Sequence, residues 1–483
     1  MVQGISAKQD LTKGPIISTL LLFAIPTLLS NILQSLNGSI NTIWVGRFLG
    51  ETALAATSNA FILVFFLFSL MFGFGMAATV MVGQNIGRGD IETARQAFGS
   101  SMGFCIILSL IIGVLGWFYA LEILNFMGTP QEAYQLASDY LRIIFISMPG
   151  NMIFVMLMMG LRGTGDSMTP LWFMIINVIL DIIFNPLLII GVGPFPELGI
   201  SGSAWAANIS TYGSLIGMLI YIYWRDLPLR LRGYEWRYLI PQNKFMRIII
   251  FKGFPMSLQM LVMSSAGMMM VKLVNYEGIN TAAAYNVSQQ LWTYLQMPAM
   301  AVGAAVSAMA AQNLGAGLWN RIDKITIIGA VITVVLVISL LVLLFTFDRV
   351  IMRLFLGNES PAIEMGRHIQ LLASWSFVFF GVAMIFFSTL RANGVVMVPL
   401  VSLFIGLYPV RLGFYYFTYP HMSADAIWIS FPVGSIFILL FSIFYYYFGH
   451  WRKTILVATM EPKLSAQKAE CFCEPAGRSK PNL

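Results

Sequence analysis

Three oxygen-bearing side chains recur one helical turn apart within an otherwise apolar stretch of this sequence. Asn177, Asp181 and Asn185 follow an i, i+4, i+8 pattern and therefore lie within about 80° of one face of a helix. One carboxylate between two amide oxygens suits a hard cation such as Na⁺, or a proton held on Asp181. We therefore predict that this helix face is a site for cation or proton coupling.

A second polar stripe, formed by Gln34, Asn37 and Asn41, lies nearer the N-terminus. These side chains fall within about 60° of one helix face. We expect Asn41 to complete an oxygen cage around Asp181, and we take Gln34 and Asn37 as candidates for a substrate cavity. Alternatively, the amides form interhelical hydrogen bonds that hold a helical bundle together.

Gln259, Met260 and Met263 are further cavity candidates in a methionine-rich stretch. Methionine is flexible and polarizable, which suits a surface that accepts unlike ligands, although it is also an ordinary core residue. Arg411 is a lone cation in an apolar stretch. We include it among the cavity candidates; it either contributes a fixed positive charge to the second lobe or extends its charged end to the membrane interface.

The elements that must position these groups are membrane-spanning helices. Hydrophobic residues form 58% of the chain and charged residues only 10%, too few to cover a water-facing surface of this size. Long stretches such as 61–82 are apolar on all faces, which favours helices over the alternating strands of a barrel. We predict an all-α, polytopic membrane protein with twelve spans, near 16–46, 53–83, 97–120, 136–160, 168–193, 202–224, 247–275, 282–311, 325–347, 368–390, 397–419 and 426–450.

The distribution of basic residues predicts the orientation. All but seven of the 28 lysines and arginines fall at the N-terminus, in alternate loops or in the C-terminal tail, so both termini are expected in the cytoplasm. We predict a cytoplasmic segment 1–14, a six-helix lobe 15–224, a cytoplasmic linker 225–246, a second six-helix lobe 247–450 and a disordered cytoplasmic tail 451–483. Cys471 and Cys473 lie in that tail, and we expect no disulfide there.

The two halves repeat the same landmarks. Pro26 matches Pro255 at an offset of 229 residues, Gln84 in "GQNIGRGD" matches Gln312 in "AQNLGAGL" at 228, and "LRGTGDSMTP" from Leu161 matches "LRANGVVMVP" at 229. Two six-helix units related by internal symmetry are a common plan of secondary transporters. The repeat predicts a cleft between two lobes.

These landmarks, with "NTIWVG" from Asn41 and "NPLLIIGVG" from Asn185, resemble the MATE (multidrug and toxic compound extrusion) family over nearly the whole chain. The resemblance implies twelve helices in two lobes. It also implies efflux of amphipathic or cationic compounds against Na⁺ or H⁺. The chain departs from the family pattern, because Asn185 and Asn41 stand where many relatives carry aspartates and Asp181 stands where they carry an asparagine.

We therefore expect a secondary active exporter in the bacterial inner (plasma) membrane that exchanges small amphipathic or cationic molecules for Na⁺ or H⁺. We expect a monomer that needs no further cofactor, contacts membrane lipid and binds no nucleic acid. The alternatives are a lipid-linked precursor flippase of the same superfamily and a passive channel. An enzyme is not expected, because the sequence has no phosphate-binding GxxxxGK[ST] loop and no second catalytic group facing Asp181.

Overall fold

The computed structural model describes residues 10–126, 131–191, 193, 195–357 and 360–453, and all regular secondary structure within these ranges is helical. The first half contains α1 (Ile16–Gly87), α2 (Ile91–Phe118), α3 (Ala120–Phe126), α4 (Gln131–Gly163), α5 (Met168–Ile190) and α6 (Ile200–Trp224). The second half contains η1 (Gly233–Leu239), α7 (Asn243–Ile248), η2 (Ile249–Gly253), α8 (Phe254–Asn275), α9 (Ile279–Gly315), α10 (Trp319–Leu356), α11 (Ala362–Ala373), α12 (Ser376–Ala392), α13 (Met397–Ile405), η3 (Gly406–Val410), α14 (Arg411–Met422), α15 (Asp425–Phe448) and η4 (His450–Lys453).

The predicted fold class is confirmed. Within the described residues, ten helical stretches are long and apolar enough to cross a membrane, and the bent pair α11 and α12 forms an eleventh. The 25 residues of α6 occupy the position of the sixth predicted span. The boundary between the first two predicted spans is a kink rather than a loop, because Gly50, with φ 81°, interrupts one long helical path through α1.

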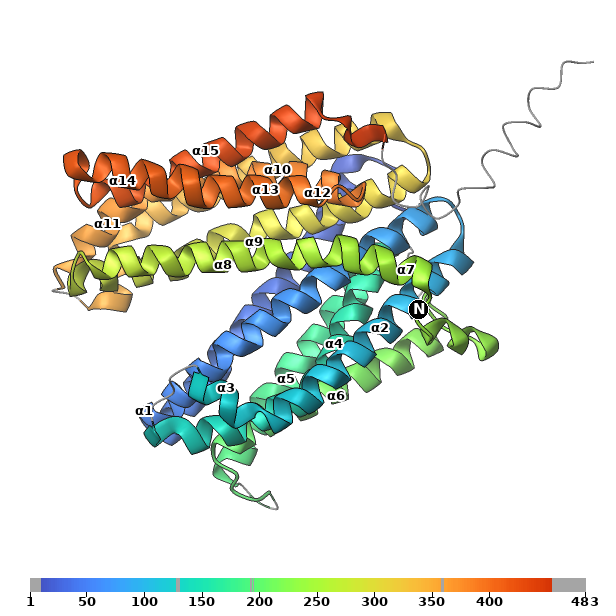
Figure 1. Ribbon diagram of the computed structural model, residues 1–483, viewed down its shortest axis with the longest axis horizontal. Helices are drawn as coiled ribbons and strands as arrows, with labels where there is room; N and C mark the ends of the chain where they lie inside the picture. The colour runs from blue at the N-terminus through green and yellow to red at the C-terminus, as the bar shows by residue number, and fades with distance from the viewer. Residues whose placement is uncertain (1–9, 127–130, 192, 194, 358–359, 454–483) are drawn as a thin grey trace, which may run out of the picture.

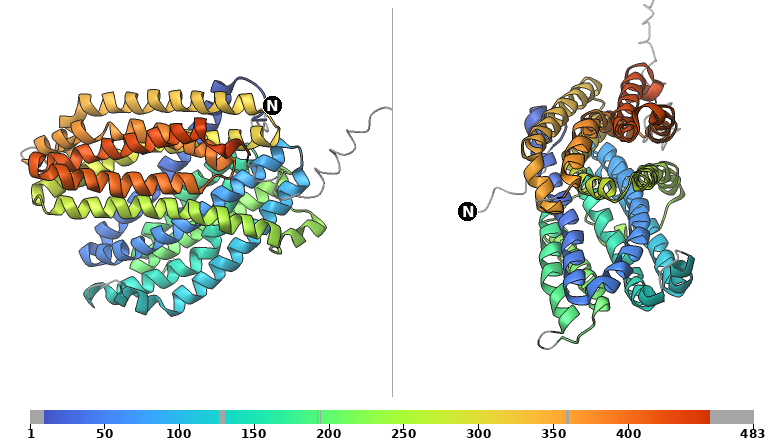
Figure 2. Two further views of the ribbon diagram at one scale, coloured as in Figure 1. Left: turned by 45° about the horizontal axis from the view of Figure 1, so that its top comes forward. Right: turned by 90° about the vertical axis from the view of Figure 1, so that its left-hand side faces the viewer.

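The helices form two groups that lie close together at one end and diverge toward the other (Figure 1). Helices α1 to α6 form one group, and α8 to α15 form the other, as the end-on view of Figure 2 shows. The larger apolar core of the first half is separate from the apolar clusters of the second half. Each half is therefore a packed lobe of its own.

The start of the first span of each lobe packs against the other lobe. Leu20 and Phe23 of α1 pack with Val302 of α9 and Ile325 of α10. Correspondingly, the Ser257 hydroxyl of α8 donates a 3.0 Å hydrogen bond to the Leu70 carbonyl of α1. The crossed contacts involve the stretch just before Pro26 and the stretch just after Pro255. The regions around both repeated prolines therefore take part in the packing between the lobes.

The lobes touch most closely at the end that carries the repeated "QN" motifs. Gln84 Nε2 donates to the Ala392 carbonyl at 2.6 Å, and Gln312 Nε2 donates to the Gly163 carbonyl at 3.0 Å. A Cβ on Gly87 would lie 1.9 Å from the Gln312 carbonyl oxygen. These reciprocal contacts close one end of the space between the lobes.

The basic linker is folded against the first lobe. Glu235 in η1 is buried, accepts a 3.0 Å bond from Arg95 Nη1 of α2, and accepts a 2.7 Å bond from the Arg232 backbone N–H. On the surface beside it, the hydrogen bond from Arg232 lowers the pKa of the Asp226 carboxyl. Several of the basic charges predicted to set topology thus also hold the linker in place. Residues 454–483, with Cys471 and Cys473, lie outside the described residues.

The close approach at Gly87 makes a stability prediction. Gly87→Ala places a methyl group against the Gln312 carbonyl and should destabilise the protein by about 1–3 kcal/mol. The matched control is Gly267→Ala in α8, where a Cβ meets nothing within 4 Å and where alanine favours the helix. Thermal unfolding of the purified protein in detergent tests the difference. Equal midpoints for the two variants would contradict the tight inter-lobe contact.

Candidate ion site and central cleft

The predicted acid lies inside the first lobe, on a helix that packs against α6 and α1. The exposed fractions of Asn177, Asp181 and Asn185 are 7%, 1% and 0%. Both carboxylate oxygens of Asp181 are buried without a hydrogen bond of normal geometry, as are the side-chain atoms of Asn185, whose amide is the polar group near enough to act on the carboxylate. A buried unpaired carboxylate is costly unless a cation or a proton neutralises it. The structure thus brings together the three α5 residues that the spacing selected.

A series of contacts leads from this carboxylate to three other helices. The Tyr140 hydroxyl of α4 interacts electrostatically with Asp181 and is hydrogen-bonded to the Asn41 amide of α1. The Asn41 Oδ1 atom accepts a 2.8 Å hydrogen bond from Ser203 of α6. Asn41 therefore contacts Tyr140 beside the site and is an interhelical hydrogen-bond partner. Its place in an oxygen cage around Asp181 stays a prediction. Tyr140 and Ser203 were not predicted, because neither stands out by type or spacing in its own segment.

The other two members of the α1 stripe lie elsewhere. Gln34 is exposed, and Asn37 is half-buried with an unpaired Oδ1 atom. Neither lines the cleft described below in this structure. Their assignment to the substrate cavity stays a prediction.

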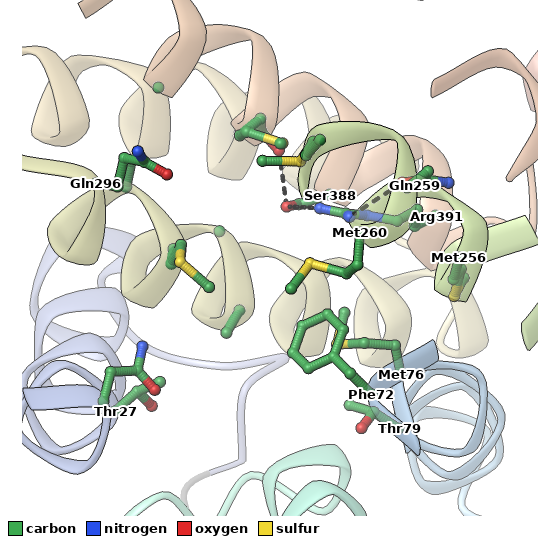
Figure 3. Close-up of a pocket in the computed structure, with 18 of the residues that line it drawn as sticks. Thr27, Phe72, Met76, Thr79, Met256, Gln259, Met260, Gln296, Ser388 and Arg391 are labelled. Carbon is green, nitrogen blue, oxygen red and sulfur yellow. Dashed lines mark hydrogen bonds between the residues drawn. The ribbon is translucent and has the colours of Figure 1, made fainter. Parts of the chain in front are cut away.

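A cleft lies between the lobes and encloses about 1150 Å³ of space, including the part open to solvent. Gln259, Met260 and Met263 of α8 line it, as the sequence predicted for a cavity. Figure 3 shows Gln259 and Met260 on one wall, with Phe72, Met76 and Thr79 of α1 opposite. The remaining lining comes from α1, α4, α8, α9 and α12 and comprises Thr27, Asn31, Met159, Arg162, Met256, Gln296, Ala299, Met300, Gly303, Ala304, Phe377, Phe380, Gly381, Met384, Ser388 and Arg391.

Two arginines in this lining were not predicted as site residues. Both occur in the sequence within the repeated landmarks, Arg162 in "LRGTGDSMTP" and Arg391 in "LRANGVVMVP". Their offset of 229 residues, the same as that of the repeat, is the signal that could have identified them as a pair. They bring two positive charges to the cleft.

Arg411 lies in the interior of the second lobe. Its side chain is 7% exposed, and its guanidinium carbon lies 3.3 Å from the centroid of the Phe431 ring. It therefore does not extend to the membrane interface, and it does not line the central cleft in this structure. A fixed positive charge in the second lobe is the interpretation that its burial supports, because cation–π contact partly replaces lost hydration.

Two repeated lobes of membrane-spanning helices, with a cleft between them and an ionisable group in one lobe, are typical of a secondary transporter. The chain belongs to the MATE family, since the MatE family model matches residues 26–187 and 255–417. It is 33% identical over 447 residues to the probable multidrug resistance protein YoeA of Bacillus subtilis, covering 92% of this chain and 96% of that protein. The family resemblance inferred from the motifs is confirmed.

Two further similarities extend the comparison. An FAD transporter of Shewanella oneidensis is 26% identical, covering 80% of this chain and 84% of that protein. An outward-facing structure of a multidrug resistance MATE transporter superposes with a TM-score of 0.83 at 20% identity, covering 93% of this chain and 99% of that chain. The solved structure supports the fold.

The unpaired carboxylate makes a second stability prediction. In sodium-free buffer at neutral pH, Asp181→Asn removes an uncompensated buried charge and should raise the free energy of unfolding by about 1–3 kcal/mol. Asp139→Asn in α4, an acid at a span end that pairs with Gln135, should change it by about 0.5 kcal/mol or less. Thermal unfolding in detergent measures both. A strong loss of stability in Asp181→Asn would mean that the carboxylate has a structural partner.

Proposed function

We propose that the protein is a secondary active exporter that moves amphipathic or cationic small molecules through the central cleft by alternating access, in exchange for Na⁺ or H⁺ at Asp181. The observation that carries the proposal is a buried carboxylate without a hydrogen bond of normal geometry, inside one lobe of a two-lobed transporter fold. Cation or proton binding would neutralise that charge. A multidrug resistance relative that matches almost end to end supports export as the direction.

Helix α1 offers a physical route from the ion site to the cleft. Near its start, Phe23 packs on the second lobe. Further along, Thr27 and Asn31 line the cleft, and Asn41 reaches the surroundings of Asp181. Ion binding that changes how Asn41 and Tyr140 pack would therefore act on a helix that also touches substrate and the opposite lobe. Such differential binding is what biases a two-state equilibrium.

Because the cleft is closed at one end, we propose that the structure represents an outward-open state. The reciprocal glutamine contacts lie at the same end as the linker and the last described residues, since Asn393 next to this end donates to the Trp451 carbonyl. The distribution of lysine and arginine predicts that this end faces the cytoplasm. On that basis we propose that the chain lies in the inner (plasma) membrane with both termini inside. We also propose that it acts as a monomer.

The alternatives are less well supported by these contacts. A passive channel does not need lobes sealed against each other at one end. An enzyme would need a second catalytic group beside Asp181, whereas the described residues that interact with it are Tyr140 and the Asn185 amide. A flippase of the same superfamily would also use a two-lobed cleft, and the transport assay below separates it by its substrate.

Transport in proteoliposomes tests the proposal. A sodium gradient and a pH gradient are imposed separately, and accumulation of a fluorescent amphipathic compound is followed. One gradient should drive transport, and Asp181→Asn should lower the driven rate by about tenfold or more because the coupling free energy is lost.

Asp139→Asn serves as the matched control and should transport at the wild-type rate. Ion-driven transport that persists in a well-expressed Asp181→Asn variant would refute coupling at this carboxylate. Ionic current in a planar bilayer, without any substrate, would identify a channel instead.

A further inference from the structure

The charge of the central cleft is unusual for a site that accepts organic cations. Among the described residues that line it, the ionisable side chains are Arg162 from the first lobe and Arg391 from the second, and no carboxylate or lysine is present. A cationic ligand entering this space would meet two like charges. The lining therefore favours a ligand of the opposite sign.

Arg162 is more than nine-tenths buried, and its Nε atom has no hydrogen-bond partner. Guanidinium stays protonated in proteins. Its position in the last turn of α4 offers some compensation through the helix dipole, but that effect is small beside the cost of burying a charge. The charge is left available to a ligand in the cleft.

Arg391 is half-buried and has only neutral partners (Figure 3). Its Nη2 atom donates to the Ser388 hydroxyl at 3.1 Å, and its Nη1 atom lies 3.5 Å from Gln259 Oε1. Its Nε atom is buried without a partner. Ser388 and Gln259 hold the guanidinium in the cleft wall without neutralising it.

The repeat explains why the two arginines occur as a pair. Each directly precedes the residue whose carbonyl accepts the reciprocal glutamine bond, Gly163 for Arg162 and Ala392 for Arg391. Each therefore stands where its lobe meets the other at the closed end of the cleft. Guanidinium groups that approach a space from opposite walls suit a carboxylate, sulfonate or phosphate group.

The rest of the lining is apolar and deformable. It includes seven methionines, Met76, Met159, Met256, Met260, Met263, Met300 and Met384, and the rings of Phe72, Phe377 and Phe380. Methionine and phenylalanine accept flat or irregular apolar groups without requiring one shape. The cleft thus offers an apolar wall together with two cations.

We infer that the ligand of this cleft is an amphipathic organic anion, with its negative group between Arg162 and Arg391 and its apolar part against the methionines and phenylalanines. This inference rests on the proposed transport function for its biological meaning. It favours anionic substrates over the cationic ones that the sequence analysis allowed.

A pair of xanthene dyes tests the sign of the preferred charge. Carboxyfluorescein is anionic and rhodamine 6G is cationic, while their ring systems are similar in size. Fluorescence anisotropy with the purified full-length protein in nanodiscs of neutral lipid should show tighter binding of carboxyfluorescein. Its affinity should fall as salt is raised. Tighter binding of rhodamine 6G would overturn the inference.

Variants locate the binding. Arg162→Gln and Arg391→Gln should each weaken carboxyfluorescein binding by about tenfold or more, the effect of losing one charge-assisted hydrogen bond. Arg162→Lys and Arg391→Lys keep the charge and should retain most of the affinity, which separates loss of charge from misfolding. Arg353→Gln in α10 removes one positive charge from an exposed position outside the cleft lining and should leave binding unchanged. Equal affinity in all five variants would refute the site.

Two further experiments are informative. One identifies the source of the negative group, and the other separates this binding site from the proposed transport function. A short-chain fluorescent phosphatidylglycerol that binds with the same arginine dependence would identify an anionic lipid as the source of the negative group, whereas carboxyfluorescein binding alone would identify a soluble anion. Arginine-dependent dye binding without ion-driven transport would support this site and refute the exporter. Ion-driven transport of rhodamine 6G that is unaffected by either arginine would support the exporter and refute this site.

Discussion

A charge buried among helices in a membrane must be neutralised by an ion, a proton, a ligand or an opposite charge. This constraint governs every functional feature of the protein. Asp181 has no hydrogen bond of normal geometry, and Arg162 and Arg391 have no acidic partner in the cleft lining that the structure describes. The proposed coupling ion and the proposed anionic ligand would supply the missing partners.

The charges are separated by position in the fold. The negative charge lies inside the first lobe, Arg411 lies over Phe431 inside the second, and the cleft between them carries the two guanidinium groups. Arg411 follows Asp181 by 230 residues, close to the repeat offset. Asp181 and Arg411 therefore place opposite charges at nearly equivalent positions of the two lobes. The lobes are pseudo-symmetric in fold, but these two positions differ in charge. In the mechanism we propose, this asymmetry would let the first lobe bind the coupling ion while the cleft binds a ligand of the opposite sign.

Motion between the lobes is constrained by a few close contacts. Gln84 and Gln312 each bond to a carbonyl of the other lobe, and Gly87 brings backbones into direct contact. The start of α1 is packed on the second lobe, while its middle reaches Asn41 beside the ion site. Opening this end requires those hydrogen bonds to break together. Occupancy of the ion site and the state of the cleft can thus be linked through one helix.

The sequence by itself determined the helical membrane fold, the repeat and the acid, because apolar length and a lone buried carboxylate are local properties of a segment. Asn177, Asp181 and Asn185 needed only helical periodicity to be placed on one face. The sequence also placed Gln259, Met260 and Met263 in a stretch predicted to line a cavity. Tertiary structure decided what those residues meet: Tyr140 and Ser203 around the ion site, Arg162 and Arg391 facing one space, and Gln34 and Arg411 outside it. Which side chains share a cavity depends on how helices distant in sequence cross, and no periodicity within one helix carries that information.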